Sequence, residues 1–277
     1  MKKLLMILLV VGVVFLSGCA GEGGVGAPSI KISNFGPLTV GASTDRPIRN
    51  GKSITLSAMF KNEGGAKVTG GEAKIVGLGT DWVFTNPSDR KHNFDIEIGR
   101  EVRKIWKVTA PSTSNYELHM TYPVEVRYTF PYGTGFRAIF SWMSDDSYNT
   151  LLDSADQTLI EETLNSKGLT IEKSSLGPIS IDLEEVEIVG NPEVWLKITN
   201  EGNGHLESNK LTDVQLSGIS CLGVTGNEIT LIDDEFEDYC TVTIGNDEDI
   251  PANIQITVKY IYYVSEKSNI YYHDIGK

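Results

Sequence analysis

Hydrophobic and polar residues alternate with a period of two in several stretches of the chain, which is the pattern of half-buried β-strands. Residues 54–60 and 124–130 show it in the first half, and residues 194–198 and 254–262 show it in the second. Parallel strands buried on both faces would instead read as unbroken apolar runs. The pattern therefore predicts antiparallel sheets.

The two halves of the chain carry similar landmarks in the same order. Asn62-Glu63-Gly64 and Asn200-Glu201-Gly202 each follow an alternating strand directly, where Asn and Gly permit the positive φ of a tight turn. Gly36-Pro37 opens the first half as Gly177-Pro178 opens the second. Matched landmarks about 130 to 140 residues apart predict an internal duplication.

The spacing of strands and turns indicates the fold class. Several short strands and about 100 residues in each half favour a β-sandwich. A strand that ends in Asn-Glu-Gly resembles the Ig-like modules, including the CARDB type, that recur in bacterial and archaeal surface proteins. The resemblance implies an all-β protein with two tandem Ig-like antiparallel β-sandwich domains, which we assign to residues 29–142 and 176–277.

Residues 143–175 interrupt the alternation. Asp146 and Ser147 can cap a helix, apolar residues recur at helical spacing as far as Leu164, and Gly168 is a natural stop. We expect one short amphipathic helix that joins the two domains and packs on a domain edge or between them. A docking helix for a partner is the alternative.

The first residues have the order of an export signal. Two lysines precede an apolar run, Leu4–Phe15, which is shorter than the roughly 20 residues of a membrane-spanning helix. The next four residues, Leu16-Ser17-Gly18-Cys19, resemble the lipobox of prokaryotic membrane lipoproteins. The resemblance implies a signal peptide over residues 1–18 and attachment of lipid, such as palmitate, to Cys19.

Lipid on Cys19 would hold the protein at the extracytoplasmic face of a cell membrane. Residues 19–28 are rich in glycine and predict a flexible tether to a folded part that starts near Ser29. An ordinary secretory signal or an uncleaved anchor helix, with Cys19 incidental, is the alternative.

The other two cysteines, Cys221 and Cys240, form an even pair outside the cytosol. We expect a disulfide between them that closes a loop of about twenty residues and contributes on the order of 3 kcal/mol. The pair is much closer in sequence than the sheet-bridging cysteines of antibody domains, so the bond should join neighbouring segments. Two free buried thiols are the alternative.

The composition is acidic, with 24 Lys and Arg against 37 Asp and Glu and a formal net charge of −13. Removal of Lys2 and Lys3 with the signal peptide makes the charge −15. Such a surface repels nucleic acid and anionic lipid headgroups, so we expect no nucleic-acid partner.

No group of residues has the spacing of a familiar catalytic or metal-binding motif. No Gly-x-Ser-x-Gly turn is present, and the four histidines are far apart in sequence. The histidines are His92, His119, His205 and His273. Two acidic runs, residues 233–238 and 246–249, offer oxygen ligands for calcium, but solvated turns are the alternative. We expect no catalytic residue, no metal and no cofactor.

Each half ends in a run of aromatic residues. The runs are Tyr128, Phe130, Tyr132, Phe136 and Phe140, and Tyr260, Tyr262, Tyr263, Tyr271 and Tyr272. Exposed rings would suit sugars or protein partners. Because both halves repeat the pattern, we expect instead a final hairpin in each half whose aromatic pairs hold the sheet together.

These observations favour a non-enzymatic lipoprotein that presents a binding, scaffolding or adhesion surface on the cell surface or envelope. Its partners would be the membrane, through the lipid, and another surface protein or a polysaccharide. A solute- or carbohydrate-binding lipoprotein is the second hypothesis, although large solute receptors usually have α/β lobes. A hydrolase is the third, and it would need two convergent carboxylates with shifted pKa values in a cleft.

Overall fold

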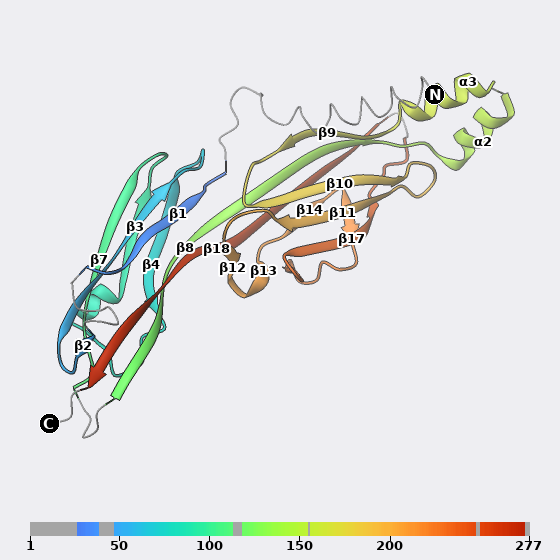
Figure 1. Ribbon diagram of the computed structural model, residues 1–277. Helices are drawn as coiled ribbons and strands as arrows, with labels where there is room; N and C mark the ends of the chain where they lie inside the picture. The colour runs from blue at the N-terminus through green and yellow to red at the C-terminus, as the bar shows by residue number, and fades with distance from the viewer. Residues whose placement is uncertain (1–26, 39–46, 113–117, 155, 248–249, 275–277) are drawn as a thin grey trace, which may run out of the picture.

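The computed structural model describes residues 27–38, 47–112, 118–154, 156–247 and 250–274 (Figure 1). These residues form mostly β-strands, which confirms the predicted all-β class. The strands are β1 (Ile30–Pro37), β2 (Ile48–Arg49), β3 (Ser53–Asn62), β4 (Val68–Val76), β5 (Val83–Phe84), β6 (Lys91–Ile96), β7 (Glu101–Thr109), β8 (Leu118–Ser141), β9 (Gly168–Ser174), β10 (Ile179–Glu187), β11 (Glu193–Asn200), β12 (His205–Leu206), β13 (Lys210–Leu211), β14 (Gln215–Ser217), β15 (Ile219–Cys221), β16 (Ile229–Thr230), β17 (Glu235–Val242) and β18 (Ala252–Asp274). The helices are α2 (Asp145–Ser154) and α3 (Gln157–Asn165), with the 3-10 turns η1 (Pro87–Arg90) and η2 (Glu207–Asn209).

Strands β8 and β18 form the backbone of the molecule. They have 24 and 23 residues and pair antiparallel along their whole length, from Leu118 opposite Asp274 to Phe140 opposite Ala252. At about 3.4 Å per residue such a strand spans about 80 Å. Figure 1 shows the two strands side by side from one end of the molecule to the other. They lie at the centre of an eight-stranded sheet with the order β12-β18-β8-β4-β6, to which β2, β9 and β14 also pair.

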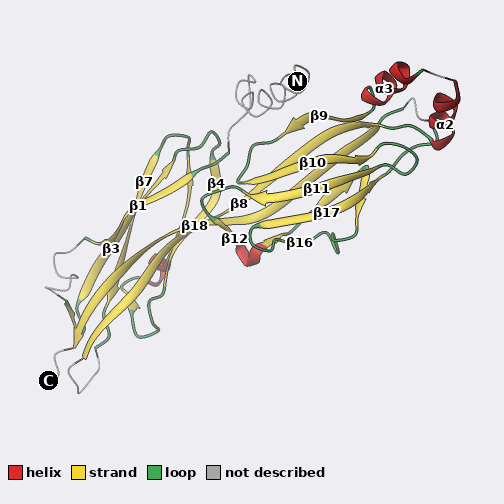
Figure 2. Cartoon of the chain, turned by 45° about the vertical axis from the view of Figure 1, so that its right-hand side comes forward, coloured by secondary structure: helices red, strands yellow, loops and turns green. Residues whose placement is uncertain are grey.

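Two four-stranded sheets complete two sandwich-like lobes. The sheet β1-β3-β7-β5 covers one end of the β8–β18 pair, and the sheet β10-β11-β17-β15 covers the other (Figure 2). We call these ends lobe 1 and lobe 2. Even-numbered residues of β8 from Val124 to Phe140 face the core, and all of them except the half-buried Tyr132 are buried. The period-two pattern in the sequence therefore describes one long strand that serves both lobes.

The link between the lobes differs from the predicted one. We expected two tandem domains joined by a helix, whereas β8 and β18 run unbroken through both lobes. The C-terminal part of β18 pairs with the first part of β8 in lobe 1, and its N-terminal part pairs with β14 in lobe 2. Lobe 1 therefore contains the last described residues of the chain as well as the first.

The predicted single connector helix is wrong in number and position. Two helices, α2 and α3, lie at the far end of lobe 2, away from the junction (Figure 1). Neither contains a buried residue, and Leu152 and Leu159 are about half exposed. The second helix is capped by Asp156, whose carboxylate accepts a hydrogen bond from the backbone N–H of Leu159 at 2.9 Å. The apolar stripe of this segment covers no core.

The repeated Asn-Glu-Gly motif makes the same turn in both lobes. Asn62 Nδ2 donates to the carbonyl of Ala66, and Asn200 Nδ2 donates to the carbonyl of Gly204. Each Asn Oδ1 also accepts from the backbone N–H two residues later. Asn62 and Asn200 therefore occupy equivalent positions at the ends of β3 and β11, as the duplication predicts.

The Gly-Pro landmarks are not equivalent. Gly36-Pro37 lies at the end of β1, whereas Gly177-Pro178 directly precedes β10. The partner of Asn62 across the sheet is Ile30, and the partner of Asn200 is Ile179. The true counterpart of the second Gly-Pro is thus the segment just before Ile30, which a match of residue types alone misplaced.

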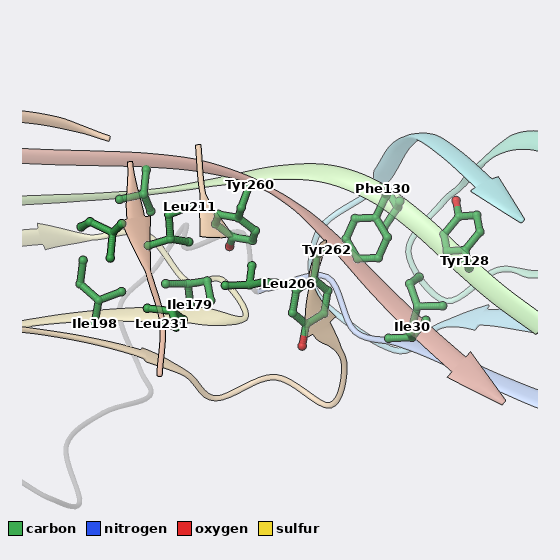
Figure 3. Close-up of a cluster of buried hydrophobic side chains, with 14 of the residues drawn as sticks. Ile30, Tyr128, Phe130, Ile179, Ile198, Leu206, Leu211, Leu231, Tyr260 and Tyr262 are labelled. Carbon is green, nitrogen blue, oxygen red and sulfur yellow. The ribbon is translucent and has the colours of Figure 1, made fainter. Parts of the chain in front are cut away.

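A single hydrophobic core continues from one lobe into the other (Figure 3). Tyr260 lies 6.4 Å from Tyr262, ring centroid to centroid, and Tyr262 packs edge-on against Phe130 at 5.8 Å. Phe130 in turn contacts Tyr128, deep in lobe 1. Because Phe130 and Tyr262 are direct partners on β8 and β18, these rings fix the junction.

Candidate functional site

The aromatic runs serve the fold, as predicted, but by a different pairing. Most of their rings are buried. The aromatic pairs form between β8 and β18, whereas the prediction placed them within a separate hairpin in each half. Phe130 pairs with Tyr262, and Tyr132 pairs with Tyr260. The core therefore accounts for most of the aromatic content.

The two cysteines form the predicted disulfide. Cys221 on β15 and Cys240 on β17 are directly opposite each other on neighbouring strands, with their Cα atoms 4.3 Å apart. Both are buried. Asp238 lies beside them, but disulfide sulfurs offer no thiolate to a metal ion. Cys19 and its predicted lipid lie outside the described residues, as do the signal peptide and most of the tether.

The first acidic run has a structural explanation. Asp233 and Asp234 both have positive φ and form the two-residue turn of the hairpin between Ile232 and Glu235. Asp234 Oδ1 also accepts a hydrogen bond from Asn200. Turn geometry, and not the order of calcium ligands, accounts for these two carboxylates.

Two histidines that are distant in sequence come together. His119 on β8 and His273 on β18 are cross-strand partners, and their rings stack with centroids 3.8 Å apart. Sequence spacing could not show this, because the pairing of the long strands creates it. Two imidazoles are fewer than the three or four protein ligands of an ordinary zinc site.

The outer face of the sheet β10-β11-β17 is the first candidate surface. Its outward side chains are Asp182, Glu184, Glu193, Trp195, Lys197, Glu235, Glu237 and Tyr239, which we call the acidic face. Trp195 and Tyr239 are cross-strand neighbours at its centre, and Tyr239 is 63% exposed. Aromatic rings at the centre of a charged surface are typical of protein interfaces.

Lys197 organises the carboxylates of the acidic face. Its Nζ lies 2.7 Å from Glu235 Oε1 and 2.9 Å from Glu237 Oε1. These hydrogen bonds raise the pKa of Lys197, and hydrogen bonds with Glu237 and Lys197 lower the pKa of Glu235. A general acid at neutral pH needs a raised carboxyl pKa, so Glu235 does not fit the acid of a hydrolase pair.

The corresponding surface of lobe 1 has the opposite charge. The outward side chains of β1, β3 and β7 are Lys31, Met59, Lys61, Glu101, Arg103, Ile105 and Lys107, which we call the basic face. Arg103 and Lys107 are exposed and form no salt bridge with any residue in the described part of the chain. Ile105 is 43% exposed beside them.

The two faces are equivalent in the duplicated fold. Asn62 donates its backbone N–H to the carbonyl of Arg100, and Asn200 donates to that of Asp234. Arg100 and Asp234 are therefore equivalent in the two lobes. Arg103 and Glu237 each follow three residues later, so they also occupy equivalent positions. The two sheets share this register, and their outer faces carry opposite prevailing charges.

A shallow groove of about 610 Å³ at the junction is the second candidate. It lies over the outer side of β8 and β18, where Gly133 lies opposite Lys259. Asp213, whose φ is 141°, reaches it and forms an ion pair with Lys259 that holds the pKa of the Asp213 carboxyl low. A second groove adjoins it and contains Arg137 and Lys173.

The comparisons with known proteins assign no family. No family model matches the chain, and no curated protein matches it. Among solved structures, a protein of unknown function from Porphyromonas gingivalis W83 is 9% identical with a TM-score of 0.20, and the match covers 88% of this chain and 98% of that one. The secreted serine protease VesC from Vibrio cholerae is 10% identical, also with a TM-score of 0.20, over 80% of this chain and 48% of its own length. Similarity at this level supports no conclusion on fold or function.

Counting charge by segment would have revealed that the two halves of the chain differ in charge. Residues 29–142 contain 15 Lys and Arg against 10 Asp and Glu, whereas residues 176–277 contain 5 against 19. The total of −13 hides this difference. No helix in the described part of the chain is long and apolar enough to cross a membrane.

Proposed function

We propose that this chain is a non-enzymatic lipoprotein, held by lipid on Cys19 at the extracytoplasmic face of a cell membrane, that binds and organises proteins outside the cell. The observation that carries the binding role is the acidic face, where Trp195 and Tyr239 form an aromatic centre among carboxylates. Large rings add contact area at a small entropy cost, and the surrounding charges select the partner.

The architecture supports a scaffold. The continuous β8–β18 pair and the shared core hold the two lobes in a fixed relation, so surfaces on both lobes are presented with a defined spacing. The lipobox-like Leu16-Ser17-Gly18-Cys19 and the glycine-rich residues 20–28 supply an anchor and a tether.

The anchor is tested by fractionation of cells that express the chain. Replacement of Cys19 by Ala should move the protein from the membrane fraction to the soluble fraction, and mass spectrometry should find lipid on the N-terminal peptide of the unaltered protein. An unmodified Cys19 in membrane-bound protein would contradict the proposal.

The binding role is tested by a photo-reactive residue in place of Tyr239 in intact cells. We expect a reproducible protein adduct that disappears when Glu184→Gln and Trp195→Ala are added. The same probe in place of Glu207, an exposed residue of η2 in the same lobe, is the control. Absence of any adduct at Tyr239, or turnover on a panel of hydrolase substrates, would count against the proposal.

Capture of a small solute or carbohydrate is the second candidate, and the junction groove with Asp213 and Lys259 favours it. A ligand that raises the melting temperature of the protein, and loses this effect on Lys259→Ala, would support solute binding in place of scaffolding.

A further inference from the structure

We infer that the basic face of lobe 1 binds the acidic face of lobe 2 on a second copy of this chain, so that copies associate head to tail. This inference rests on the proposed scaffolding function and names the partner of the acidic face. The two faces are those defined above, and they lie on different lobes (Figure 2).

Lys61 of the basic face pairs with Glu63, and Lys197 of the acidic face pairs with Glu235 and Glu237, but four other charges of the two faces form no salt bridge within the described part of one copy. Arg103 and Lys107 on the basic face have no salt bridge to a described residue, and neither have Glu184 and Glu193 on the acidic face. The prevailing charge is positive on the basic face and negative on the acidic face, so each face attracts the other and repels a second copy of itself. Contact between faces of opposite sign is therefore favoured over contact between identical faces.

Each face also has an apolar centre. Ile105 and the half-buried Met59 lie beside Arg103 on the basic face, and Trp195 and Tyr239 lie beside Glu184 on the acidic face. An interface with an apolar centre and charged surroundings has the usual distribution of a specific protein contact. Two sheets can pack face to face in this way when their strands are roughly aligned.

A second copy fits better than a small anion or nucleic acid. Such a ligand would occupy only the basic face and leave the aromatic centre around Trp195 unused. The β8–β18 pair holds the two lobes apart, so the faces of one copy do not meet each other. Because each contact joins two unlike faces, a pair of copies still has one basic and one acidic face available. Further copies can bind there, so contacts of this kind build open chains or closed rings.

The test is sedimentation velocity on the chain from residue 19 with Cys19→Ala, which retains every described residue. We expect association that grows with concentration at low ionic strength, on the order of 20 mM, and weakens at about 500 mM. Arg103→Gln with Lys107→Gln should weaken association on the order of tenfold or more, and so should Asp182→Asn with Glu184→Gln.

Matched controls remove the same amount of charge elsewhere. Arg137→Gln with Lys173→Gln removes two exposed cations from lobe 2, and Glu161→Gln with Glu162→Gln removes two carboxylates from α3. Both controls should associate as the unaltered chain does. All altered positions in the two faces are on the surface, and circular dichroism and melting temperatures confirm that each variant folds.

A mixing experiment separates head-to-tail contact from a symmetric dimer. The basic-face variant and the acidic-face variant should each be mainly monomeric alone, because one half of the contact is weakened in each. Mixed in equal amounts they should form dimers and no larger species, since only one intact contact remains.

Three results would overturn the inference: a monomeric unaltered chain at millimolar concentration and low salt, association that both face variants retain, or no dimer on mixing. If the chain is monomeric but the probe at Tyr239 still captures another protein, self-association fails and the scaffolding function stands. If neither occurs, both proposals fail.

Discussion

The hydroxyl oxygens of Tyr260 and Thr134 lie 2.9 Å apart in the buried junction between the lobes. Tyr260 belongs to β18 and Thr134 to β8. This hydrogen bond therefore joins the two long strands at the point where the lobes meet.

Tyr260→Phe should lower the free energy of unfolding by about 1–3 kcal/mol, because it leaves the buried hydroxyl of Thr134 without this partner. Urea unfolding measures the loss. Addition of Thr134→Val should cost less than the sum of the single changes. Tyr263→Phe, at a hydroxyl without a hydrogen bond to a described residue, is the control, and equal effects at Tyr260 and Tyr263 would contradict this account.

Removal of the disulfide should destabilise the protein without changing its fold. Cys221→Ser with Cys240→Ser opens a loop whose ends are 19 residues apart, and we expect a loss of about 2–4 kcal/mol. Chemical denaturation with and without a reductant is the measurement. The reductant should lower the stability of the unaltered protein and leave the double variant unchanged; an effect on both would point to another cause.

Gly71→Ala should be destabilising by about 1–3 kcal/mol or more, because the added Cβ collides with the hydroxyl and ring of the buried Tyr128. The rigid core around Tyr128 leaves little room for the ring to move. Gly79→Ala is the matched control, since its Cβ meets no heavy atom within 4 Å. Similar melting temperatures for both variants would show that the core at Tyr128 is looser than the contacts indicate.

The stability should fall steeply in alkaline solution. Burial raises the pKa of Tyr262 to about 12 and also raises those of Tyr128 and Tyr260, whereas an ordinary phenol titrates near 10.0. Above pH 10 the unfolded state has therefore lost protons that the folded state keeps, so the free energy of unfolding decreases as pH rises towards 12. Denaturation at a series of pH values tests this, and Tyr262→Phe should reduce the slope. A flat profile between pH 10 and 12 would contradict the assigned burial.

Local patterns in the sequence identify the strands, the Asn62 and Asn200 turns and the disulfide, because each depends on nearby residues. The alternation from Val124 to Phe140 is also in the sequence, but its interpretation as the final hairpin of the first half hid the single long strand. The pairing of β8 with β18 depends on residues more than a hundred positions apart, which periodicity cannot register. The contacts of His119 with His273 and of Phe130 with Tyr262 follow from that pairing and were unpredictable for the same reason.

The two charged faces illustrate a different limit. Their residues alternate with core residues along each strand, so the outward positions of β7 and β17 were readable in the sequence. What the sequence could not supply was the register that sets Trp195 beside Tyr239 and Met59 beside Arg103. A surface depends on neighbours across strands, and those become known only with the sheet.

The shared strand β18 also constrains the order in which the protein can mature. Its last residues complete the sheet of lobe 1, although that lobe begins at the opposite end of the chain. A ribosome or an export channel that releases the chain from its N-terminus therefore delivers the closing strand of both lobes last. Neither lobe can bury its core until β18 has emerged, and contacts between residues so far apart form slowly. The molecule is then expected to fold as one late cooperative unit, and not as two modules in succession.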